Sequence, residues 1–446
     1  MSLSRSGSRS ALAARSLAAA AVVILTTSLP AAAATSQPND YYFAAHTQWA
    51  LYGAPASINV PAAWCASTGS GIVVADIDTG ADFSHEDLGG KLLAGAAFVN
   101  PSGDSSGRMT GAGQAAVADD NGHGTMTAGL IIANTNNRLG IAAVAPDARA
   151  LIVKVIDSSG HGNPSDVAAG MRWAVDHGAN VLNLSLSSSQ LVVTGGVSDG
   201  SPISQAADYA AEHGVAVAFA AGNDSSGFNP YQLLEDKPTV LVVGALARDG
   251  SVPSYSNGGA SIYAPGGDGY AGSDPPGRLA HNVVSTYNGD AYVTAAGTSI
   301  ATPMVSGTFA LLMAHGYSAD GAKQQILGSA RQAAVSQLDA AAALGVSPTS
   351  TCGLPAMAPP AIRPPTLRRA PSPTYRAASA QATVSAPARA LPGAPSASIE
   401  LVLPFPTARA LAVQRPHGRT DPLRWALLIA GAALFAAAAV SVRRFG

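Results

Sequence analysis

Three short segments of this sequence carry residue types that together could make a serine nucleophilic. Asp78 stands in Asp-Thr-Gly, His123 in Asn-Gly-His-Gly-Thr and Ser299 in Gly-Thr-Ser. A serine hydroxyl attacks only when a base takes its proton, and a histidine oriented by a carboxylate is such a base near neutral pH. Each motif alone is weak, because a lone histidine is usually structural and a serine at a helix start is usually an N-cap. Together they predict acyl-transfer chemistry.

A fourth residue completes this set. Asn223 follows the apolar run 215–220 in the tripeptide Ala-Gly-Asn. A side-chain amide at that place could donate to the oxyanion that forms when a carbonyl group is attacked. Asp-Thr-Gly also occurs in aspartic proteases, but those need two such carboxylates and this sequence has one. The sequence therefore favours Asp78, His123 and Ser299 as catalytic residues, with Asn223 as the oxyanion donor.

The elements that must position these residues alternate between strands and helices. Apolar runs typical of buried strands cover residues 72–75, 151–156, 181–186, 215–220 and 240–244, and Ala-rich helical stretches include 166–177 and 202–213. Such alternation indicates a parallel sheet covered on both faces, in which active groups sit at the C-terminal ends of strands. We therefore predict an α/β fold with a doubly wound, mostly parallel sheet and helices on both faces.

Over residues 39–344 the sequence resembles the subtilisin-like serine protease family. The matching segments, in family order, are 74–80, 123–125 with 128–129, 144–146, 220–223, 264–266 and 297–303. The order Asp, His, Ser along the chain is the order known for subtilisin. The resemblance implies a serine endopeptidase that acts on protein or peptide substrates and needs no cofactor for catalysis. It also implies the same triad and the same oxyanion donor.

The resemblance further implies a set of residues that binds an extended peptide by backbone hydrogen bonds, a form of strand addition. These residues are Gly160, Gly162, Ser185, Leu186, Ser187, Ala220, Ala221 and Gly222. Ser187 and Ser188 replace glycines that are common beside the primary pocket. We therefore expect a narrowed pocket that prefers small or medium apolar P1 side chains.

A structural calcium ion near the N-terminus is also implied by the resemblance. The matching ligands are the side chains of Gln48, Asp87 and Asn137 and the carbonyl groups of Thr135, Leu139 and Ile141. Oxygen donors of mixed type suit calcium. The alternative is that residues 135–137 form an ordinary polar loop.

One residue next to the triad departs from the family pattern. Asp76 sits where the family usually has an apolar residue, two positions before Asp78, so both side chains point to the same side of the strand. Asp76 could perturb Asp78 or bond nearby backbone. We expect the second.

Both ends of the chain have features of membrane-related segments. An N-terminal region with three arginines, an apolar run at 17–25 and Ala-Ala-Ala at 32–34 is typical of a secretory signal peptide. Residues 425–442 form an uncharged run long enough to span a bilayer, followed by two arginines. We predict a signal peptide at 1–34, a peptidase domain at 35–345, a Pro/Ala/Ser-rich disordered stalk at 346–422, a transmembrane helix at 423–442 and a cytoplasmic tail at 443–446.

These segments predict a single-pass protein of the cell membrane with an extracellular catalytic domain and a cytoplasmic C-terminus. Thermitase-like and mycosin-like members of the family begin in a similar way, and mycosins share the stalk and the anchor. The alternative function is therefore that of a mycosin-like component of a secretion complex with a mainly scaffolding role. An intact triad does not separate the two.

Composition narrows the partners further. Only 12% of the residues are charged and the net charge is −2, so nothing suggests the basic stripe of a nucleic-acid-binding protein. The two cysteines, Cys65 and Cys352, are too few for a disulfide scaffold and are spaced unlike a zinc cluster. Export to an oxidising space would allow a single disulfide between them.

Overall fold

The computed structural model describes residues 37–99, 106–186, 197–269, 281–350, Cys352 and 366–367. Within these residues one sheet has ten strands, here given in spatial order. They are β11 (Arg331–Gln332), β12 (Ser336–Gln337), β8 (Ile262–Pro265), β7 (Val240–Leu246), β6 (Ala216–Ala220), β5 (Val181–Leu184), β1 (Val73–Asp78), β4 (Arg149–Lys154), β2 (Leu92–Ala97) and β3 (Gly111–Ala112). All neighbouring pairs from β12 to β2 are parallel, and the outermost pair on each side is antiparallel.

A second, three-stranded sheet has the order β13 (Thr366–Leu367), β10 (Ala291–Ala295) and β9 (Val283–Tyr287). The helices are α1 (Tyr41–Ala44), α2 (Val60–Ala63), α3 (His123–Ile132), α4 (Pro164–Asp176), α5 (Pro202–Glu212), α6 (Thr298–Ala314), α7 (Ala319–Ser329) and α8 (Ala340–Ala343), with a 3₁₀ turn at Gln232–Leu234. The predicted strands and helices are confirmed, with ends that differ by a few residues.

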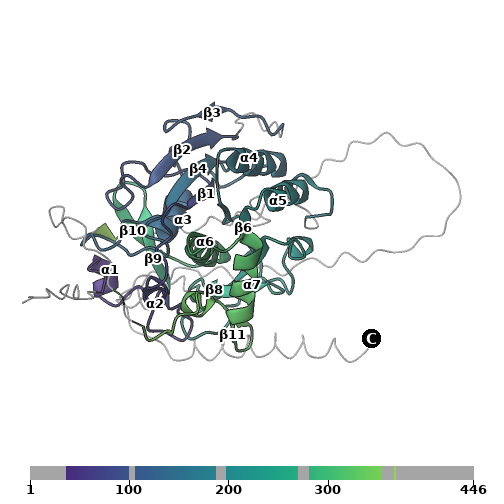
Figure 1. The fold of residues 1–446 in the computed structure, drawn as a ribbon. Coiled ribbons are helices and arrows are strands. Elements are labelled where there is room, and N and C mark those ends of the chain that lie inside the picture. Colours follow the sequence, from purple (N-terminus) through teal and green to yellow (C-terminus); the bar gives the residue numbers. More distant parts are fainter. Residues whose placement is uncertain are drawn as a thin grey trace, which may run out of the picture. The chain divides into compact units, whose positions relative to one another are not determined.

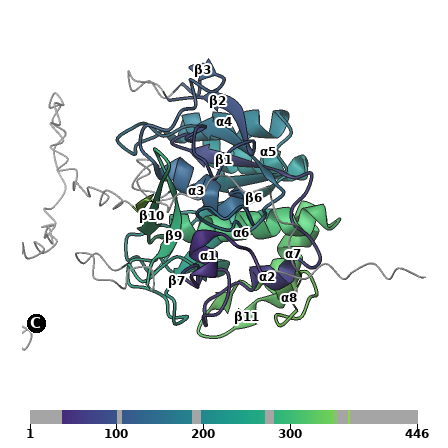
Figure 2. The ribbon, with the colours of Figure 1, turned by 90° about the vertical axis from the view of Figure 1, so that its left-hand side faces the viewer.

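Two hydrophobic cores, one on each face of the large sheet, fix the layers. Helices α3 and α6 cover one face and α4 and α5 the other (Figures 1 and 2). Within β1 the buried side chains alternate between the cores, Val74 on the α3/α6 face and Ala75 and Ile77 on the α4/α5 face. Asp76 and Asp78 therefore face α3 and α6, so two carboxyl groups lie on one side of a buried strand.

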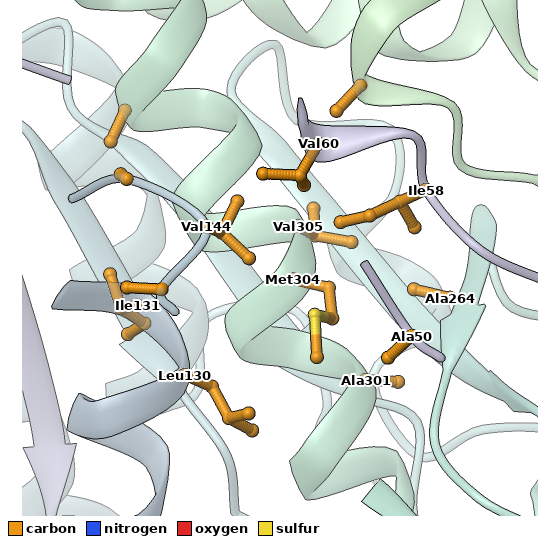
Figure 3. Packing of buried hydrophobic residues seen from close by; sticks show 14 of the residues in the cluster. Ala50, Ile58, Val60, Leu130, Ile131, Val144, Ala264, Ala301, Met304 and Val305 are labelled. Atoms are coloured by element: carbon orange, nitrogen blue, oxygen red, sulfur yellow. The ribbon is translucent and has the colours of Figure 1, made fainter. Parts of the chain in front are cut away.

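The long helix α6 forms the centre of the larger core. Its Met304 and Val305 belong to the same buried cluster as Leu130 and Ile131 of α3 (Figure 3). Helix α6 also packs on β5, β6 and β7. This packing places the start of α6, which carries Ser299, near the C-terminal ends of the central strands.

Ordered structure continues past residue 345, where we predicted the start of a disordered stalk. Val346 packs against the larger core, and Thr366–Leu367 pairs with β10. Cys352 is bonded to Cys65, with 5.1 Å between their α-carbons, so the predicted disulfide is confirmed. Val346, Cys352 and Thr366–Leu367, which fall in the predicted stalk, are thus attached to the peptidase domain.

Among the described residues, none of the helices has both the length and the apolar character needed to cross a bilayer. The predicted signal peptide and the predicted span at 423–442 lie outside the described residues.

Candidate active site

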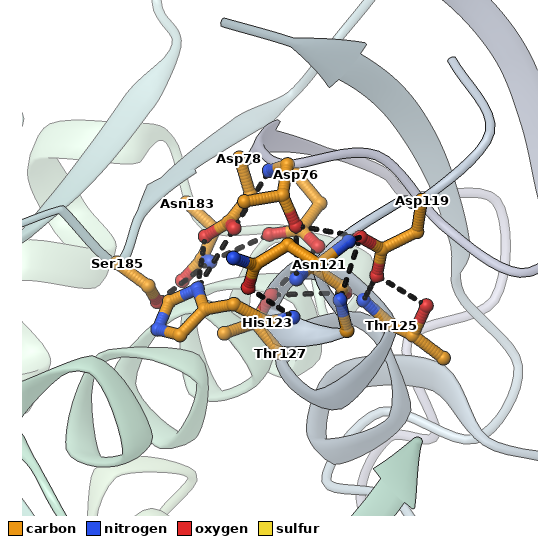
Figure 4. Close-up of polar contacts among 12 residues, drawn as sticks. Asp76, Asp78, Asp119, Asn121, His123, Thr125, Thr127, Asn183 and Ser185 are labelled. Carbon is orange, nitrogen blue, oxygen red and sulfur yellow. Dashed lines mark hydrogen bonds and ion pairs between the residues drawn. The ribbon is translucent and has the colours of Figure 1, made fainter. Parts of the chain in front are cut away.

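The C-terminal end of β1 and the first residue of α3 bring a carboxylate and an imidazole together. Nδ1 of His123 lies 2.8 Å from Oδ1 and 2.9 Å from Oδ2 of Asp78 (Figure 4). The backbone N–H of Thr79 also donates to Asp78, at 2.7 Å. Asp78 is fully buried, whereas the His123 side chain is 18% exposed. The carboxylate therefore fixes the ring from the protein side, and the ring edge remains accessible.

A close contact between two glycines allows this approach. A β-carbon on Gly124 would lie 2.1 Å from the carbonyl oxygen of Gly80, so the start of α3 can sit against the turn after β1 only without side chains there. The N–H of Gly124 donates to Thr79 Oγ1 at 2.9 Å. Any larger residue at position 124 would push His123 away from Asp78.

Asp119 caps α3, and our sequence reasoning missed it. Its Oδ2 accepts from the backbone N–H of Thr125 at 2.9 Å, and its Oδ1 accepts from Gly122 N at 2.8 Å and from Thr79 Oγ1 at 2.9 Å. One carboxylate thus joins the end of β1 to the helix that begins with His123. The usual N-cap signal does not point to it, because Gly122 occupies the N-cap position of α3 and Asp119 lies three residues earlier.

The charges around His123 favour the protonated form of its imidazole ring. Burial lowers the pKa of His123, but the negative charge of Asp78 and its hydrogen bond raise the pKa more, so the result lies above the usual 6.5. The imidazolium form is therefore stabilised at this place. This is the electrostatic behaviour that a general base needs when it takes a proton from a nucleophile.

Ser299 and Asn223 line the same small space. Ser299 is the second residue of α6, and Asn223 follows β6. The point where a β-carbon on Gly297 would stand lies 3.0 Å from Ser299 Oγ and 3.5 Å from Asn223 Nδ2. The backbone N–H of Thr298 donates to Asn223 Oδ1 at 2.8 Å, which turns the amide nitrogen to the other side. The hydroxyl group of Ser299 and the amide nitrogen of Asn223 thus both lie close to Gly297, at the start of α6.

The described peptide-binding residues follow β5 and β6, which are neighbours, and β4, which β1 separates from β5. Ser185 and Leu186 follow β5 and are buried, and Ala220 is the last residue of β6, ahead of Ala221 and Gly222. Gly160 and Gly162 lie in the loop between β4 and α4. Ser187 lies outside the described residues, and so does the rest of segment 187–196.

The carboxyl group of Asp76 is bonded to side chains, not to the nearby backbone that we expected. Asn183 Nδ2 lies 2.8 Å from its Oδ1, and Thr127 Oγ1 lies 2.9 Å from its Oδ2 (Figure 4). Burial, followed by the charge of Asp78, raises the pKa of Asp76 well above the usual value. The expectation was wrong because the strand register places Asp76 beside Asn183, which the sequence does not show.

Two of the residues predicted to bind calcium, Asn137 and Ile141, contact Asp87. Both oxygens of this buried carboxyl group accept hydrogen bonds, from Asn137 Nδ2 at 2.8 Å and from Ile141 N at 2.9 Å. The side-chain amide of Gln48 is bonded to the backbone of Ala142. Among the residues that the structure describes, no cluster of three or more His, Cys, Asp or Glu could hold a metal. The predicted set contains a single carboxyl group, so calcium stays a prediction.

The sequence of this chain is similar to a known protein family and to several of its members. Residues 69–345 match the family model described as the subtilase family. The chain is 36% identical over 291 residues to thermitase of Thermoactinomyces vulgaris, covering 65% of this chain and 90% of thermitase. It is 37% identical over 247 residues to subtilisin Savinase of Lederbergia lenta, covering 55% of this chain and 77% of that protein. The chain therefore belongs to the subtilase family of serine endopeptidases.

A solved structure supports the same conclusion for the fold. The structure of a protease from Pseudoalteromonas arctica is similar with a TM-score of 0.58 and 29% identity, over 70% of this chain and 99% of that one. The predicted subtilisin-like arrangement of a large, mostly parallel sheet is confirmed.

Proposed function

We propose that this endopeptidase cleaves peptide bonds through an acyl-enzyme formed on Ser299, with His123 as general base, Asp78 as its orienting carboxylate and Asn223 as oxyanion donor. The observation that carries the proposal is the pair of contacts from Asp78 to His123 Nδ1. A neutral imidazole has one N–H, and the carboxylate holds it on Nδ1. Nε2 is then the basic nitrogen that takes the serine proton.

Attack of Ser299 Oγ on the scissile carbonyl forms a tetrahedral intermediate. His123 then gives its proton to the leaving amine, and water repeats the sequence to release the acyl group. Because Thr298 holds the amide oxygen of Asn223, the Nδ2 group is set to donate to the oxyanion before the reaction begins. A donor fixed in advance needs no reorganisation when charge develops.

The substrate is an extended segment of a protein or peptide. Ser185 and Leu186 follow β5, and residues 160–162 follow β4, with β1 between these two strands. Together with Ser187 they would pair with the substrate backbone on either side. Ala220, Ala221 and Gly222 would form one wall of the primary pocket. Labelling by a fluorophosphonate probe tests the proposed nucleophile, because Ser299→Ala should abolish labelling and peptide hydrolysis together.

The proposed location is the outer face of the cell membrane. It rests on the sequence of residues 1–34 and 423–446 and on the Pro-rich composition of 346–422. Two experiments test it: N-terminal sequencing of the mature protein should begin near residue 35, and the full chain should sediment with membranes while a chain ending at residue 422 is released. If both chains are released from the membrane, or if neither is, the proposed C-terminal anchor is wrong.

A scaffolding role in a secretion complex, as in mycosins, is the alternative. It is supported by the same terminal segments. A Ser299→Ala protein that restores secretion in a deletion strain favours the scaffold, and one that fails although it is present at the membrane favours the protease.

A structural calcium ion belongs to the proposal. Asp87 is fully buried, and the hydrogen-bond partners described for its carboxyl group are neutral. Since a buried negative charge needs compensation, the donor set suits a hard cation. Asn137 would have to turn its amide over, because its nitrogen faces Asp87. Calcium has no part in the chemical steps.

A further inference from the structure

Beneath the proposed triad lies a second set of polar residues with matching spacing. Asp76 is two residues from Asp78 on β1, and Thr127 is four residues from His123 on α3. Ser306 is seven residues, about two helical turns, from Ser299 on α6. Residues at these spacings lie on the same face of a strand or helix. Each element that carries a triad residue therefore carries one of these residues as well.

Asn183 of β5 bonds to the residues on β1 and α6, and the residue on α3 bonds to Asp76. It is the direct neighbour of Asp76 across the parallel strands β1 and β5. Its Nδ2 donates to Asp76 Oδ1 at 2.8 Å, and its Oδ1 accepts from Ser306 Oγ at 2.7 Å. Thr127 Oγ1 lies 2.9 Å from Asp76 Oδ2. We call Thr127, Asp76, Asn183 and Ser306 the buried polar layer.

The arrangement of donors and acceptors suits a protonated Asp76. Its Oδ1 faces the amide donor of Asn183, and its Oδ2 faces the hydroxyl of Thr127. That hydroxyl has one hydrogen and a second acceptor, the carbonyl oxygen of Gly124 at 3.1 Å. If Asp76 donates to Thr127, then Thr127 donates to Gly124 and every group in the row is satisfied.

No cationic neighbour among the described residues balances a charge on Asp76 as directly as His123 balances Asp78. The titratable groups that face Asp76 are Asp78 on its own strand and His123 on α3, whereas Asn183 on β5 and Ser306 on α6 are neutral. All four layer residues are at most 1% exposed. A second negative charge two residues from Asp78 would be costly there, and the raised pKa of Asp76 agrees.

We propose that Asp76, carrying a proton, is a positioning residue, and that the neutral buried polar layer holds β1, α3 and α6 in the register that the triad requires. This inference rests on the proposed function of the triad. Ionisation of Asp76 at alkaline pH removes the hydrogen that Thr127 accepts and places a second charge behind Asp78. The expected result is a fall in kcat at alkaline pH with little change in KM.

Asp76→Asn is the decisive variant, because the amide reproduces the hydrogen bonds of the protonated acid and cannot ionise. Using the full chain, kcat and KM for one peptide are measured from pH 5 to 11. We expect the variant to keep kcat within about twofold of wild type near pH 7 and to lose the alkaline decline. Asp76→Ala should lower kcat at least tenfold at every pH, so the asparagine rescues what the alanine loses. Ser306→Ala, a change without charge, should give a loss that does not depend on pH.

Thermal unfolding tests the protonation without any need for activity. A proton bound by the folded state and released on unfolding makes wild type less stable as pH rises above the ordinary Asp pKa. The melting temperature of Asp76→Asn should therefore exceed that of wild type by a margin that widens from pH 5 to pH 8. A constant or shrinking margin overturns the proposal. So does an Asp76→Asn profile whose acid limb, set by His123, moves to lower pH, since that requires a charged Asp76 in wild type.

Failure of the proposed function gives a different result. In that case wild type and every variant lack both hydrolysis and fluorophosphonate labelling, whereas the melting-temperature margin still reports whether Asp76 is protonated.

Discussion

Among the buried carboxyl groups of the described residues, two pairs have different surroundings. Asp78 belongs to the candidate active site and Asp76 lies two residues before it on β1, whereas Asp40 and Asp87 lie near the N-terminal segment. The first pair is bonded mainly to side chains, His123 among them. The second pair is bonded mainly to backbone N–H groups of the loop after α3. The two pairs are buried to a similar degree, but their different partners indicate different roles.

Partners of the first pair come from α3, which carries His123, and from β5, which pairs with β1. A change there alters geometry at the reacting atoms. Partners of the second pair come from residues 136–141, so a change there loosens the loop and the N-terminal segment. Burial raises the pKa of Asp40 to about 6 and that of Asp87 to about 8. We expect the first region to control turnover and the second to control stability.

The largest expected effect comes from the triad itself. Ser299→Ala and His123→Ala should each lower kcat by about 10⁶-fold, a magnitude measured on subtilisin itself, because the hydroxyl and its base act as one unit. Turnover of both variants is measured against a fluorogenic peptide, with melting temperatures as the control for folding. The double variant should be little slower than either single one. Additive losses would show that the two residues act independently.

Asn223 should have the next largest effect. Asn223→Ala removes an oxyanion donor and should raise the activation free energy by roughly 3 kcal/mol, again a value known from subtilisin. Since the donor acts on the transition state, kcat should fall while KM stays nearly constant. Asn223→Asp keeps the oxygen that Thr298 holds but replaces the donor, so it should be at least as slow. A change confined to KM would assign Asn223 to substrate binding.

The triad residues around Asp78 could be predicted from the sequence, whereas the buried polar layer around Asp76 could not. Asp78, His123 and Ser299 stand in motifs whose glycines and helix starts have a recognisable order. Thr127 and Ser306 look like ordinary helix residues. Only the pairing of β1 with β5 places Asp76 against Asn183. Contacts of that kind depend on strand register, which a local pattern does not determine.

In the second region, around Asp40 and Asp87, the sequence pointed to one of the two carboxyl groups and missed the other. The sequence pointed to Asp87 and Asn137 through a resemblance, and the structure brings them within hydrogen-bond distance. Asp40 was not singled out, although its carboxylate accepts from the backbone of Asn136 and Asn137. A single aspartate after an asparagine carries no periodic signal. Its role arises from a contact with residues almost a hundred positions away.

A smaller effect is expected at the pocket next to the first region. The chain should hydrolyse peptides with Ala or Leu at P1 faster than the same peptide with Phe. A hydrophobic pocket discriminates by about 1–3 kcal/mol for a methylene-sized difference, so the preference should be graded. Ser187→Gly should reduce it. Fastest cleavage after Phe, unchanged by Ser187→Gly, would mean that the serine does not narrow the pocket.

The smallest expected effect is a calcium-dependent rise in melting temperature. A ligand that binds only the folded state at ten times its Kd adds about 1.4 kcal/mol of stability. Asp87 must lose its proton to bind calcium, and without a cation burial raises its pKa to about 8. Calcium binding therefore competes with protonation, and the gain should be larger at pH 9 than at pH 6. Melting curves with calcium and with EDTA at both pH values measure this difference.

Asp87→Asn is the matched control for that measurement. The amide keeps the size of the side chain and removes the charge, so the calcium-dependent gain should disappear while kcat near neutral pH stays close to that of wild type. Asp76→Asn should behave in the opposite way, with an altered pH profile of kcat and an unchanged response to calcium. If EDTA still lowers the melting temperature of Asp87→Asn, the cation binds at a site that does not include Asp87. No response in wild type at either pH would mean that the hydrogen bonds from Asn137 and Ile141 hold this region without a cation.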